Sequence, residues 1–400
     1  MNAVLKWVSV TVISLAILFG AAWWYIGSDW RGLLSDLPTD ANVLFWSQNQ
    51  REYAFKMMDQ LPALAQSSVI AASDNPKKLG EGEAINFNTN IEQFFDEQSL
   101  AGMLVLHKGD IRFERYGLGH SPEKRWTSFS VAKSFTASLV GIALKEGHIS
   151  SLDDSVSQYI EDLKGSVYDG VSVSQLLTMT SGVKWNESYT DPQSDVALFN
   201  QHKAADGLPT IVSYMQNAER AHPAEEKWLY STGETNLIGI LVEQATGVPI
   251  AQYLTEKIWQ PYGMADQASW LLGADGNEIS GCCIQASLRD YARYGLFVLD
   301  EGKIDGQSIL PEGFLAAATT KQADIGSEGK GYGYQWWTFD DGTFTARGIF
   351  GQTIFIDPTR QLVVAMNGNW PNASEPELNA KRFELINEIQ NIIDQENVSN

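Results

Sequence analysis

The sequence predicts an α+β fold: one antiparallel sheet assembled from both ends of the chain and flanked by helices, with a helical insert in between. Residues 102–107 and 111–116 are two apolar-rich runs around a Gly-containing turn, which is typical of a β-hairpin. After residue 331, four short strand-like runs alternate with turns rich in Asp, Gly and Pro. Helical periodicity dominates the chain between these two stretches. The helices should therefore interrupt a sheet that is completed only near the C-terminus.

The individual elements follow from the same patterns. A short amphipathic helix is expected at residues 91–98, and a polar-amphipathic helix at residues 376–395 ends the chain. The four late strands are expected at residues 332–339, 343–346, 353–356 and 362–366. Helices of the insert are expected at residues 130–147, 171–182, 210–218, 236–245, 250–259 and 286–299. Together they predict one main domain over residues 91–400.

The charge and the cysteines exclude some classes of function. The chain has 400 residues, of which 28 are basic and 49 acidic, giving a formal net charge of −21. Such a surface repels nucleic acid, so nucleic acid is not an expected partner. Five scattered histidines and the adjacent Cys282 and Cys283 make no convincing metal site, and no cofactor is expected. A strained vicinal disulfide is one interpretation of the cysteine pair, but two small buried apolar side chains are favoured.

The N-terminal residues carry a membrane-targeting pattern. Residues 7–26 form an uncharged apolar run of about the length that spans a bilayer. Trp23, Trp24 and Tyr25 near its end resemble an interfacial aromatic belt, whereas a cleavable signal peptide would have a shorter apolar region and a small-residue cleavage site. We therefore expect an uncleaved signal anchor over residues 1–27, a single-pass transmembrane helix with the body on the extracytoplasmic, periplasmic side. Residues 28–90 are expected to be a stem that packs on the main body.

Ser130 and Lys133 form an S-x-x-K arrangement at the start of a predicted helix. Residues three apart on a helix lie on one face, so Lys133 comes within reach of the Ser130 hydroxyl. The alternative is an ordinary N-cap serine with a solvated lysine. A cation in the first turn is unfavourable beside the positive end of the helix dipole, which favours a Lys133 that is partly desolvated and neutral. The pattern predicts a serine nucleophile with a lysine base.

Tyr230 precedes the segment Ser231-Thr232-Gly233, which resembles a helix start. A tyrosine held near Lys133 could act with it as a base and then as an acid toward the leaving group. Taken alone, a tyrosine that packs before a helix is the simpler interpretation.

Several segments together resemble the serine β-lactamase-like superfamily in its class C and esterase branch. They are SVAKS (residues 130–134), LLTMTSG (176–182), YSTGETNLIG (230–239) and GIFGQTIFIDP (348–358), within a resemblance that covers about residues 100–370. Two further segments, RWTSFSVAKS (125–134) and GVKWNESYTDPQSDVA (182–197), look most similar to the 6-aminohexanoate-dimer hydrolases, which are nylon-oligomer amidases, and their carboxylesterase relatives. The resemblance implies a β-lactamase/transpeptidase-like fold with Ser130 as nucleophile, Lys133 as base and Tyr230 as the third catalytic residue.

The sequence departs from the superfamily pattern at two motifs. Thr232 stands where the Tyr-x-Asn motif has its asparagine, and Ile349-Phe350-Gly351 replaces Lys-Thr-Gly. That lysine helps hold the carboxylate of β-lactams, so its loss argues against penicillin as a substrate. The resemblance places Gly351 and Gln352 on an edge strand that faces the nucleophile, with Phe350 and Gly351 close to the substrate. The backbone N–H groups of Ser130 and Gln352 would then form the oxyanion hole.

The resemblance also implies that Tyr189 hydrogen-bonds to the scissile amide, although a packed loop aromatic is equally consistent with the sequence. Trp336 and Trp337 are neighbours on a predicted strand and should point to opposite faces, one into the core.

Three functions remain open from the sequence. The first is a membrane-tethered serine hydrolase that cleaves small carboxylic esters or linear amides through an acyl-enzyme on Ser130. The second is a D-amino-acid peptidase or weak β-lactamase acting on peptidoglycan-like substrates, which the missing lysine disfavours. The third is a non-catalytic sensing or scaffold module, which an intact set of Ser130, Lys133 and Tyr230 disfavours.

Overall fold

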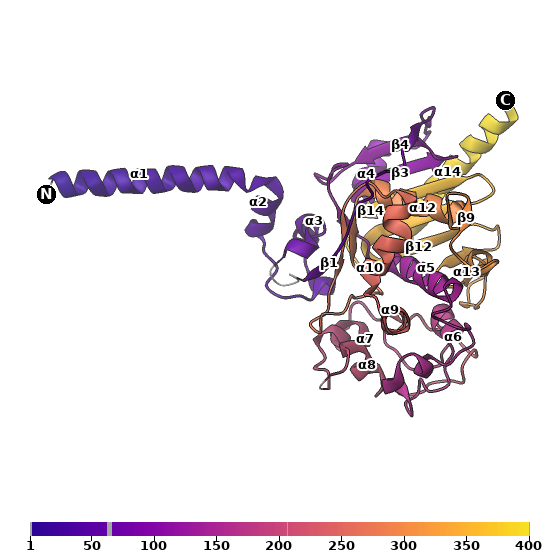
Figure 1. Cartoon of the computed structure of the whole chain (residues 1–400). Helices are drawn as coiled ribbons and strands as arrows, with labels where there is room; N and C mark the ends of the chain where they lie inside the picture. Colours follow the sequence, from indigo (N-terminus) through magenta and orange to yellow (C-terminus); the bar gives the residue numbers. More distant parts are fainter. Residues whose placement is uncertain (1, 62–65, 206, 400) are drawn as a thin grey trace.

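An eight-stranded sheet forms the centre of the body (Figure 1). The computed structural model describes residues 2–61, 66–205 and 207–399. The strand order is β10-β11-β12-β13-β14-β3-β4-β2. In chain order these strands are Gly80–Glu81 (β2), Leu100–His107 (β3), Asp110–Tyr116 (β4), Lys330–Tyr332 (β10), Trp337–Phe339 (β11), Phe344–Gly348 (β12), Gln352–Asp357 (β13) and Leu362–Gly368 (β14).

The two ends of the chain meet at the pairing of β14 with β3. Leu362 lies opposite His107 and Asn367 opposite Gly102 in an antiparallel register. The remaining pairings are also antiparallel except that β2 runs parallel to β4. The predicted sheet, assembled from both chain ends around a helical insert, is confirmed.

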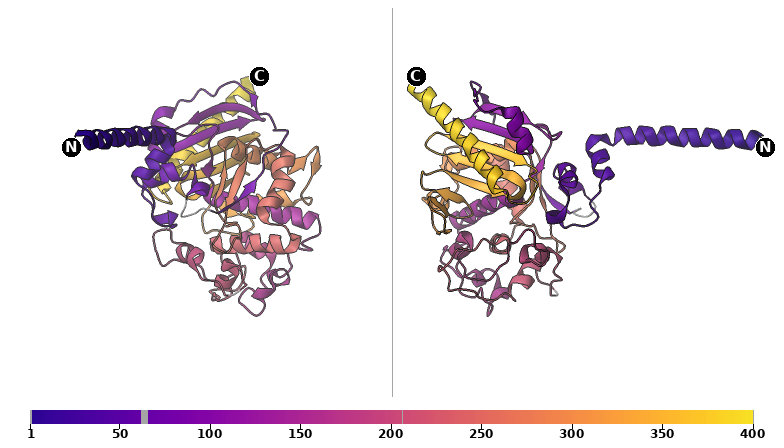
Figure 2. Two further views of the ribbon diagram at one scale, coloured as in Figure 1. Left: turned by 60° about the vertical axis from the view of Figure 1, so that its left-hand side comes forward. Right: turned by 180° about the vertical axis from the view of Figure 1, so that it is seen from behind.

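Helices cover both faces of this sheet (Figure 2). Ile91–Glu97 (α4) and Pro376–Ser399 (α14) pack on one face, and Ala132–Lys145 (α5) and Leu288–Leu299 (α12) on the other. Alternate residues of β3 enter the two cores: Met103 and Val105 pack with α14, whereas Leu104 and Leu106 pack with α5 and α12. Because both faces are buried, β3 is apolar along most of its length instead of alternating with polar residues.

The insert contains helices, and its short strands form a second, smaller sheet with β1 (Ser67–Ile70), which precedes the main hairpin in the chain. Its helices are Val173–Thr178 (α6), Asp195–Leu198 (α7), Thr210–Met215 (α8), Thr232–Thr246 (α9), Ile250–Leu254 (α10), Gln260–Tyr262 (α11) and Phe314–Ala318 (α13), and a small hairpin pairs Lys303–Ile304 (β8) with Gln307–Ser308 (β9). The second sheet has the order β1-β6-β7-β5, from Ser67–Ile70 (β1), Ala268–Leu271 (β6), Ile284–Ala286 (β7) and Trp126–Thr127 (β5). Strands of two to four residues are too short to show a period of two, so the sequence does not predict them.

One predicted strand is divided in the structure. Residues 332–339 were expected to be continuous, but β10 ends at Tyr332 and β11 begins at Trp337. Between them Gln335 has φ 63°, a left-handed conformation that cannot continue a strand. Trp336 is buried in the core and Trp337 is partly exposed, so the two neighbours face different surroundings as expected.

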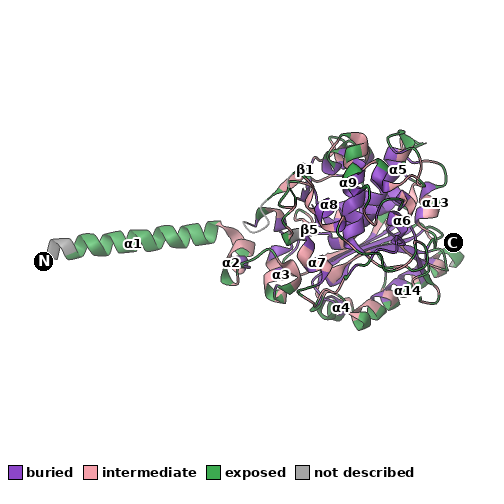
Figure 3. Ribbon diagram, turned by 90° about the horizontal axis from the view of Figure 1, so that it is seen from below, coloured by how far each residue is buried: buried purple, intermediate pink, exposed green. Residues whose placement is uncertain are grey.

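The N-terminal helix Asn2–Tyr25 (α1) projects away from the body (Figures 1 and 3). Its segment Leu5–Tyr25 has a mean hydropathy of 1.9 and none of it is buried against the body. Among the described residues, it is the single unbroken helix long and apolar enough to cross a membrane. Such a helix near an N-terminus fits a membrane anchor or a signal sequence.

The segment after α1 packs closely on the body. It contains Gly27–Ser35 (α2) and Gln48–Ala54 (α3). Arg51 of α3 is buried and donates to the carbonyls of Trp370 and Pro371 at 2.9 and 2.8 Å and to the Asn369 side chain at 3.1 Å. Lys56 pairs with Asp29 at 3.0 Å, which ties α2 to the end of α3. We call residues 28–61 and 66–90 the stem; its part up to residue 61 is fixed to the body at several points.

Candidate active site

Ser130 stands on a tight turn between β5 and α5. The residue before it, Phe129, has φ 43°, a conformation that costs a bulky residue about 1–3 kcal/mol. The Phe129 ring packs edge-to-face against Phe55 and Phe350, with ring centroids 5.0 and 5.4 Å apart. This aromatic packing holds a strained turn in which Ser130 is partly exposed while both neighbours are buried.

Lys133 lies one turn beyond Ser130 and is fully buried. Its Nζ donates to the Gly281 carbonyl at 2.7 Å and to the Thr232 hydroxyl at 3.0 Å. A Cβ on Gly281 would lie only 3.1 Å from this Nζ, which explains the glycine at this position. Burial lowers the pKa of Lys133 from 10.5 to about 8, against an opposing effect of the Glu187 carboxylate. Near neutral pH, a fraction of the protein molecules therefore carries Lys133 as a neutral amine.

Tyr230 reaches the same point from the start of α9. It precedes Ser231, the N-cap residue, whose hydroxyl accepts from the backbone N–H of Glu234 at 3.2 Å. The Tyr230 phenol and Ser130 line the same cavity, and Lys133 Nζ lies 5.4 Å from the ring centroid. Burial and the charge of Glu187 raise the pKa of Tyr230 above its ordinary value, and the neighbouring Ser130 only partly opposes this. The phenol is therefore protonated and available as a proton donor.

Glu187 completes the polar cluster and was not singled out from the sequence. It accepts from the Thr232 backbone N–H at 2.9 Å, from the Tyr189 hydroxyl at 3.0 Å, and also from the Thr232 hydroxyl and the Trp185 indole. The Thr232 hydroxyl thus accepts from Lys133 and donates to Glu187, which uses its single proton and one lone pair. The one available signal was the position of Glu187 inside the segment 182–197 that carried the family resemblance.

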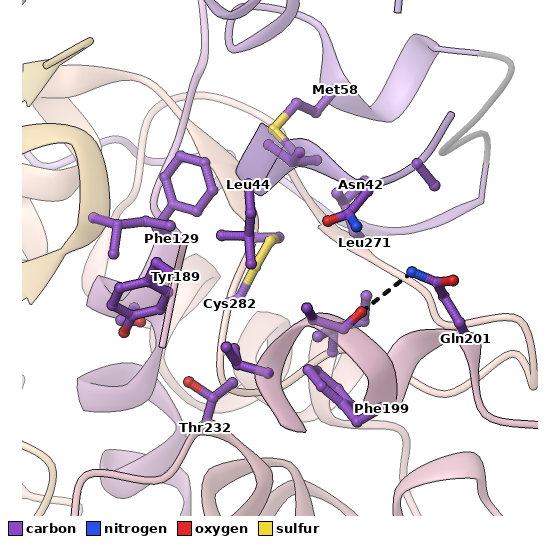
Figure 4. A pocket seen from close by; sticks show the side chains of 18 of the residues that line it. Asn42, Leu44, Met58, Phe129, Tyr189, Phe199, Gln201, Thr232, Leu271 and Cys282 are labelled. Carbon is purple, nitrogen blue, oxygen red and sulfur yellow. Dashed lines mark hydrogen bonds between the residues drawn. A yellow bond between two sulfur atoms is a disulfide. The ribbon is translucent and has the colours of Figure 1, made fainter. Parts of the chain in front are cut away.

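Ser130 lies at the junction of two cavities of about 580 and 280 Å³. Three residues line both of them: Ser130, Tyr189 and Ile349. The larger cavity has mostly apolar walls (Figure 4), whereas Tyr230 and Glu187 line the smaller one. Tyr189 is therefore placed where it can contact a ligand in either cavity. No group of His, Cys, Asp and Glu suited to a metal ion occurs among the described residues.

The end of β12 packs against the turn that carries Ser130. A Cβ on Gly348 would come within 2.5 Å of the Ser128 carbonyl oxygen and 3.0 Å of Phe129 Cβ, so glycine allows this close approach. Ile349 follows and contacts the space beside Ser130. The backbone next to the Ser130 turn is therefore that of Gly348 and Ile349.

The structure corrects the expected position of Gln352. This residue begins β13, which lies between β12 and β14 inside the sheet instead of on an edge facing Ser130. Its buried side chain donates to the Gly368 and Ile349 carbonyls at 2.8 and 3.2 Å. Phe350 and Gly351, expected near the substrate, are also buried and line neither cavity. The turn of residues 349–351 that joins β12 to β13 moves them out of the site, which a motif match cannot reveal.

Two arginines line the smaller cavity, the partly exposed Arg347 and the buried Arg382. Arg347 comes from β12 and Arg382 from α14, and both donate to the Asn379 side-chain oxygen, at 3.1 and 2.6 Å. Burial lowers the pKa of both guanidinium groups, and the charge of Arg347 lowers that of Arg382 further. Within the described part of the chain neither forms an ion pair, and Arg382 Nε is buried without a hydrogen-bond partner. The arginine side of this cavity is therefore suited to an anionic group, whereas Glu187 places a carboxylate on another part of its wall.

Comparison with known proteins agrees with this fold and arrangement. The family model described as Beta-lactamase matches residues 87–386, well over half of the chain. The chain belongs to the beta-lactamase family. It is 28% identical over 298 residues to the 6-aminohexanoate-dimer hydrolase of Paenarthrobacter ureafaciens, covering 71% of this chain and 76% of that protein. A beta-lactamase of Pseudomonas fluorescens is 26% identical over 186 residues, 44% of this chain and 48% of that protein.

A solved structure shows the same fold. A provisionally assigned 6-aminohexanoate-dimer hydrolase from Bacillus anthracis superposes with a TM-score of 0.76 at 22% identity, covering 87% of this chain and 95% of that one. The expected resemblance and fold class are confirmed. The protein is a hydrolase of the serine beta-lactamase fold, related to 6-aminohexanoate-dimer hydrolase.

Both departures from the motifs of the beta-lactamase family have a structural explanation. Thr232, in place of the asparagine, still provides an oxygen to Lys133 Nζ. Ile349 stands where the motif has a lysine, so the sequence lacks that positive charge. Arg347 and Arg382 instead provide positive charge at the smaller cavity. These two arginines are separated by 35 positions and come from different elements, so no local pattern connects them.

The cysteine pair also differs from the favoured expectation. Cys282 and Cys283 form a vicinal disulfide instead of two free buried thiols, and both line the larger cavity (Figure 4). They follow Gly281, whose carbonyl accepts from Lys133. The disulfide is thus part of the wall beside the candidate base.

Proposed function

We propose that the protein is a serine acyl hydrolase that cleaves small carboxylic esters or linear amides through an acyl-enzyme on Ser130. One observation supports this above all. Ser130 lies where two cavities meet, the Tyr230 phenol lines one of them beside it, and the buried Lys133 amine, one helical turn after Ser130, lies 5.4 Å from the centroid of the Tyr230 ring. A nucleophile with a neutral base, a protonated acid and space on either side of the scissile bond is what acyl transfer requires.

The roles of the three groups follow from their pKa values. Lys133, with a pKa of about 8, accepts the Ser130 proton as Oγ attacks the carbonyl carbon and a C–O bond forms. Tyr230, which stays protonated, donates its proton to the leaving oxygen or nitrogen as the scissile bond breaks, and it is reprotonated from Lys133. Water then attacks the acyl-enzyme, the acyl–Oγ bond breaks, Ser130 recovers a proton, and a carboxylic acid leaves.

The oxyanion of each tetrahedral intermediate needs donors beside Ser130. The proposal assigns them to the backbone N–H groups of Ser130 and Ile349, in place of Gln352. Its support is the close packing of Gly348 on the Ser128 carbonyl, which brings the end of β12 against the nucleophile turn. Backbone donors need no particular side chain, so the altered third motif is compatible with this role.

The leaving group should occupy the smaller cavity, because Tyr230 lines that cavity and not the larger one. Arg347 and Arg382 then favour a leaving group with a carboxylate or another anion. The same pair is the one observation in favour of the second candidate, a weak β-lactamase or D-amino-acid peptidase, since those substrates also carry a carboxylate. Nitrocefin hydrolysis would distinguish this second candidate from a simple esterase or amidase.

The proposal includes a membrane location. The apolar α1, the three aromatic residues at its end and its lack of contact with the body support a signal anchor that leaves the body on the extracytoplasmic, periplasmic side. Protease protection of the full chain in sealed spheroplasts tests this. Digestion of the body from outside supports the proposed topology, and full protection contradicts it.

The catalytic assignment is tested by labelling and turnover. A fluorophosphonate probe should label the wild type and not Ser130→Ala, and Ser130→Ala should lose turnover of p-nitrophenyl acetate. Tyr230→Phe should lower kcat by about 10²- to 10⁴-fold, because the acid is lost while the ring packing is retained. Ser128→Ala, which alters a serine two residues away outside both cavities, serves as the control for labelling. Retained turnover in Ser130→Ala would overturn the assignment.

A further inference from the structure

The larger cavity beside Ser130 is a partly open space with mostly apolar walls. Its volume of about 580 Å³ lies within the range of sites that bind drug-sized ligands, about 300–1,000 Å³. Phe129, Phe199, Leu271 and Ile279 contribute to its walls, together with the disulfide of Cys282 and Cys283. Among the described residues that line it, Asp40 is the single charged one, and its side chain is exposed. An apolar ligand segment would therefore gain free energy on entering it.

One wall of this cavity comes from the stem. Residues 40–44 and Met58 line it, and Figure 4 shows Leu44 and Met58 on the same space as Phe129 and Cys282 of the body. These stem residues lie outside the segment 87–386 that matches the beta-lactamase family. One wall of the cavity is thus formed by residues outside the segment that matches the family model.

The stem wall is held firmly enough to define a binding site. The Trp46 indole donates to the Asp40 carbonyl at 3.2 Å, which fixes the start of the wall. Asp59, next to Met58, pairs with Arg125 at 2.7 Å and accepts from Ser269 at 2.7 Å. Both contacts join the stem to the body beside the cavity. The stem residues that form this wall are therefore fixed to the body by side-chain contacts.

The two cavities have opposite character on the two sides of Ser130. The proposed mechanism places the leaving group with Tyr230 and the arginines in the smaller cavity. The acyl part of the substrate must then extend into the larger one. An apolar acyl cavity and a polar leaving-group cavity together select an amphiphilic substrate.

We propose that the larger cavity is an acyl-chain subsite, and that the preferred substrates are esters or amides of aliphatic carboxylic acids whose chain is buried against the stem. This proposal rests on the proposed function, and it adds the substrate class. In the reaction the aliphatic acyl group is transferred from its alcohol or amine to Ser130 Oγ and then to water. The products are a fatty carboxylate and a polar alcohol or amine.

The first test is a series of p-nitrophenyl esters, from acetate through butyrate and hexanoate to octanoate, with the full chain in detergent below the critical micelle concentration of each ester. All members share a leaving group, so differences report on the acyl subsite. Each added methylene that becomes buried should raise kcat/KM by about fourfold until the cavity is filled. A flat or falling series, with acetate still hydrolysed in a Ser130-dependent way, would overturn the acyl-chain subsite and leave the proposed function intact.

The second test changes the stem wall. Leu44→Trp should fill part of the cavity and lower kcat/KM at least tenfold more for octanoate than for acetate. Phe45→Trp is the matched control, because Phe45 is the next residue, is exposed and does not line the cavity. Equal effects of Leu44→Trp on acetate and octanoate would contradict the subsite.

A third measurement does not depend on any variant folding. Wild-type protein should react faster with a decyl fluorophosphonate than with an ethyl one, and equal rates would contradict the subsite. Absence of any Ser130 labelling by either probe would instead overturn the proposed function itself. The acyl chain could come from a soluble amphiphile or from a bilayer lipid. Comparing turnover of octanoyl ester in solution with that of a long-chain ester embedded in vesicles distinguishes these two sources of the same chemistry.

Discussion

The pH dependence of the reaction provides a test of Lys133 as the base. Burial lowers the pKa of Lys133 to about 8, so the fraction of Lys133 that is a neutral amine increases as pH rises through that value. If the neutral amine accepts the Ser130 proton, about 9% of the protein is active at pH 7 and about 91% at pH 9. We therefore expect kcat/KM for p-nitrophenyl acetate to rise about tenfold between these two pH values and to level off above.

The variant Glu187→Gln should shift the pH profile in a specific direction, which a general effect of pH on the protein would not produce. The Glu187 carboxylate raises the pKa of Lys133, because its negative charge stabilises the ammonium form across the Thr232 hydroxyl. Removing the charge should move the rising limb of the profile to lower pH. At pH 7 the variant then holds a larger neutral fraction of Lys133 than the wild type.

The assay is kcat/KM for the acetate ester from pH 5.5 to 10, corrected for spontaneous hydrolysis in each buffer. Glu219→Gln is the matched control: it makes the same chemical change at an exposed carboxylate that pairs with Lys184 at 3.4 Å. A limb that moves to higher pH in Glu187→Gln, or that moves equally in both variants, would refute the assignment of Lys133 as the titrating base.

Two further predictions concern the smaller cavity and the stem. Arg347→Gln should lower kcat/KM about 10- to 100-fold more for an ester whose leaving group carries a carboxylate than for its neutral counterpart, because one charge-assisted hydrogen bond is lost. An equal loss for both esters would show that Arg347 does not bind an anion. Phe55→Ala should lower the free energy of unfolding by about 3–5 kcal/mol in urea titrations, since this fully buried ring packs against Trp126, Phe129 and Phe350. Phe45→Ala, which truncates an exposed ring of the same stem, is the control, and similar losses in both would contradict the proposed role of Phe55.

Local sequence was sufficient where a short-range rule decides the structure. The S-x-x-K spacing places Lys133 one helical turn from Ser130, and the Ser231 N-cap fixes the start of α9 directly after Tyr230. The hairpin of β3 and β4 was predictable because its turn and its apolar runs are adjacent in the chain. The unfavourable position of a cation at a helix start also indicated the direction of the Lys133 pKa shift correctly.

Sequence reasoning failed where the answer depends on a bend or on distant segments. The turn after β12 moves Gln352 into the sheet and leaves Ile349 beside Ser130, and no spacing in the motif shows that bend. Arg347 and Arg382 meet only because α14 returns across the sheet next to β12. Glu187 is connected to Lys133 through the hydroxyl of Thr232, which lies 45 residues later in the chain.

The sequence by itself determined the family, the nucleophile candidate and the apolar helix at the N-terminus, because each of these is encoded in a contiguous pattern of residues. Only the tertiary structure decided the shape and polarity of the site: an apolar cavity closed by the stem on one side of Ser130 and an arginine-lined cavity on the other. Cavities are formed by side chains from elements far apart in the chain, and their volume and charge depend on packing that no local pattern specifies.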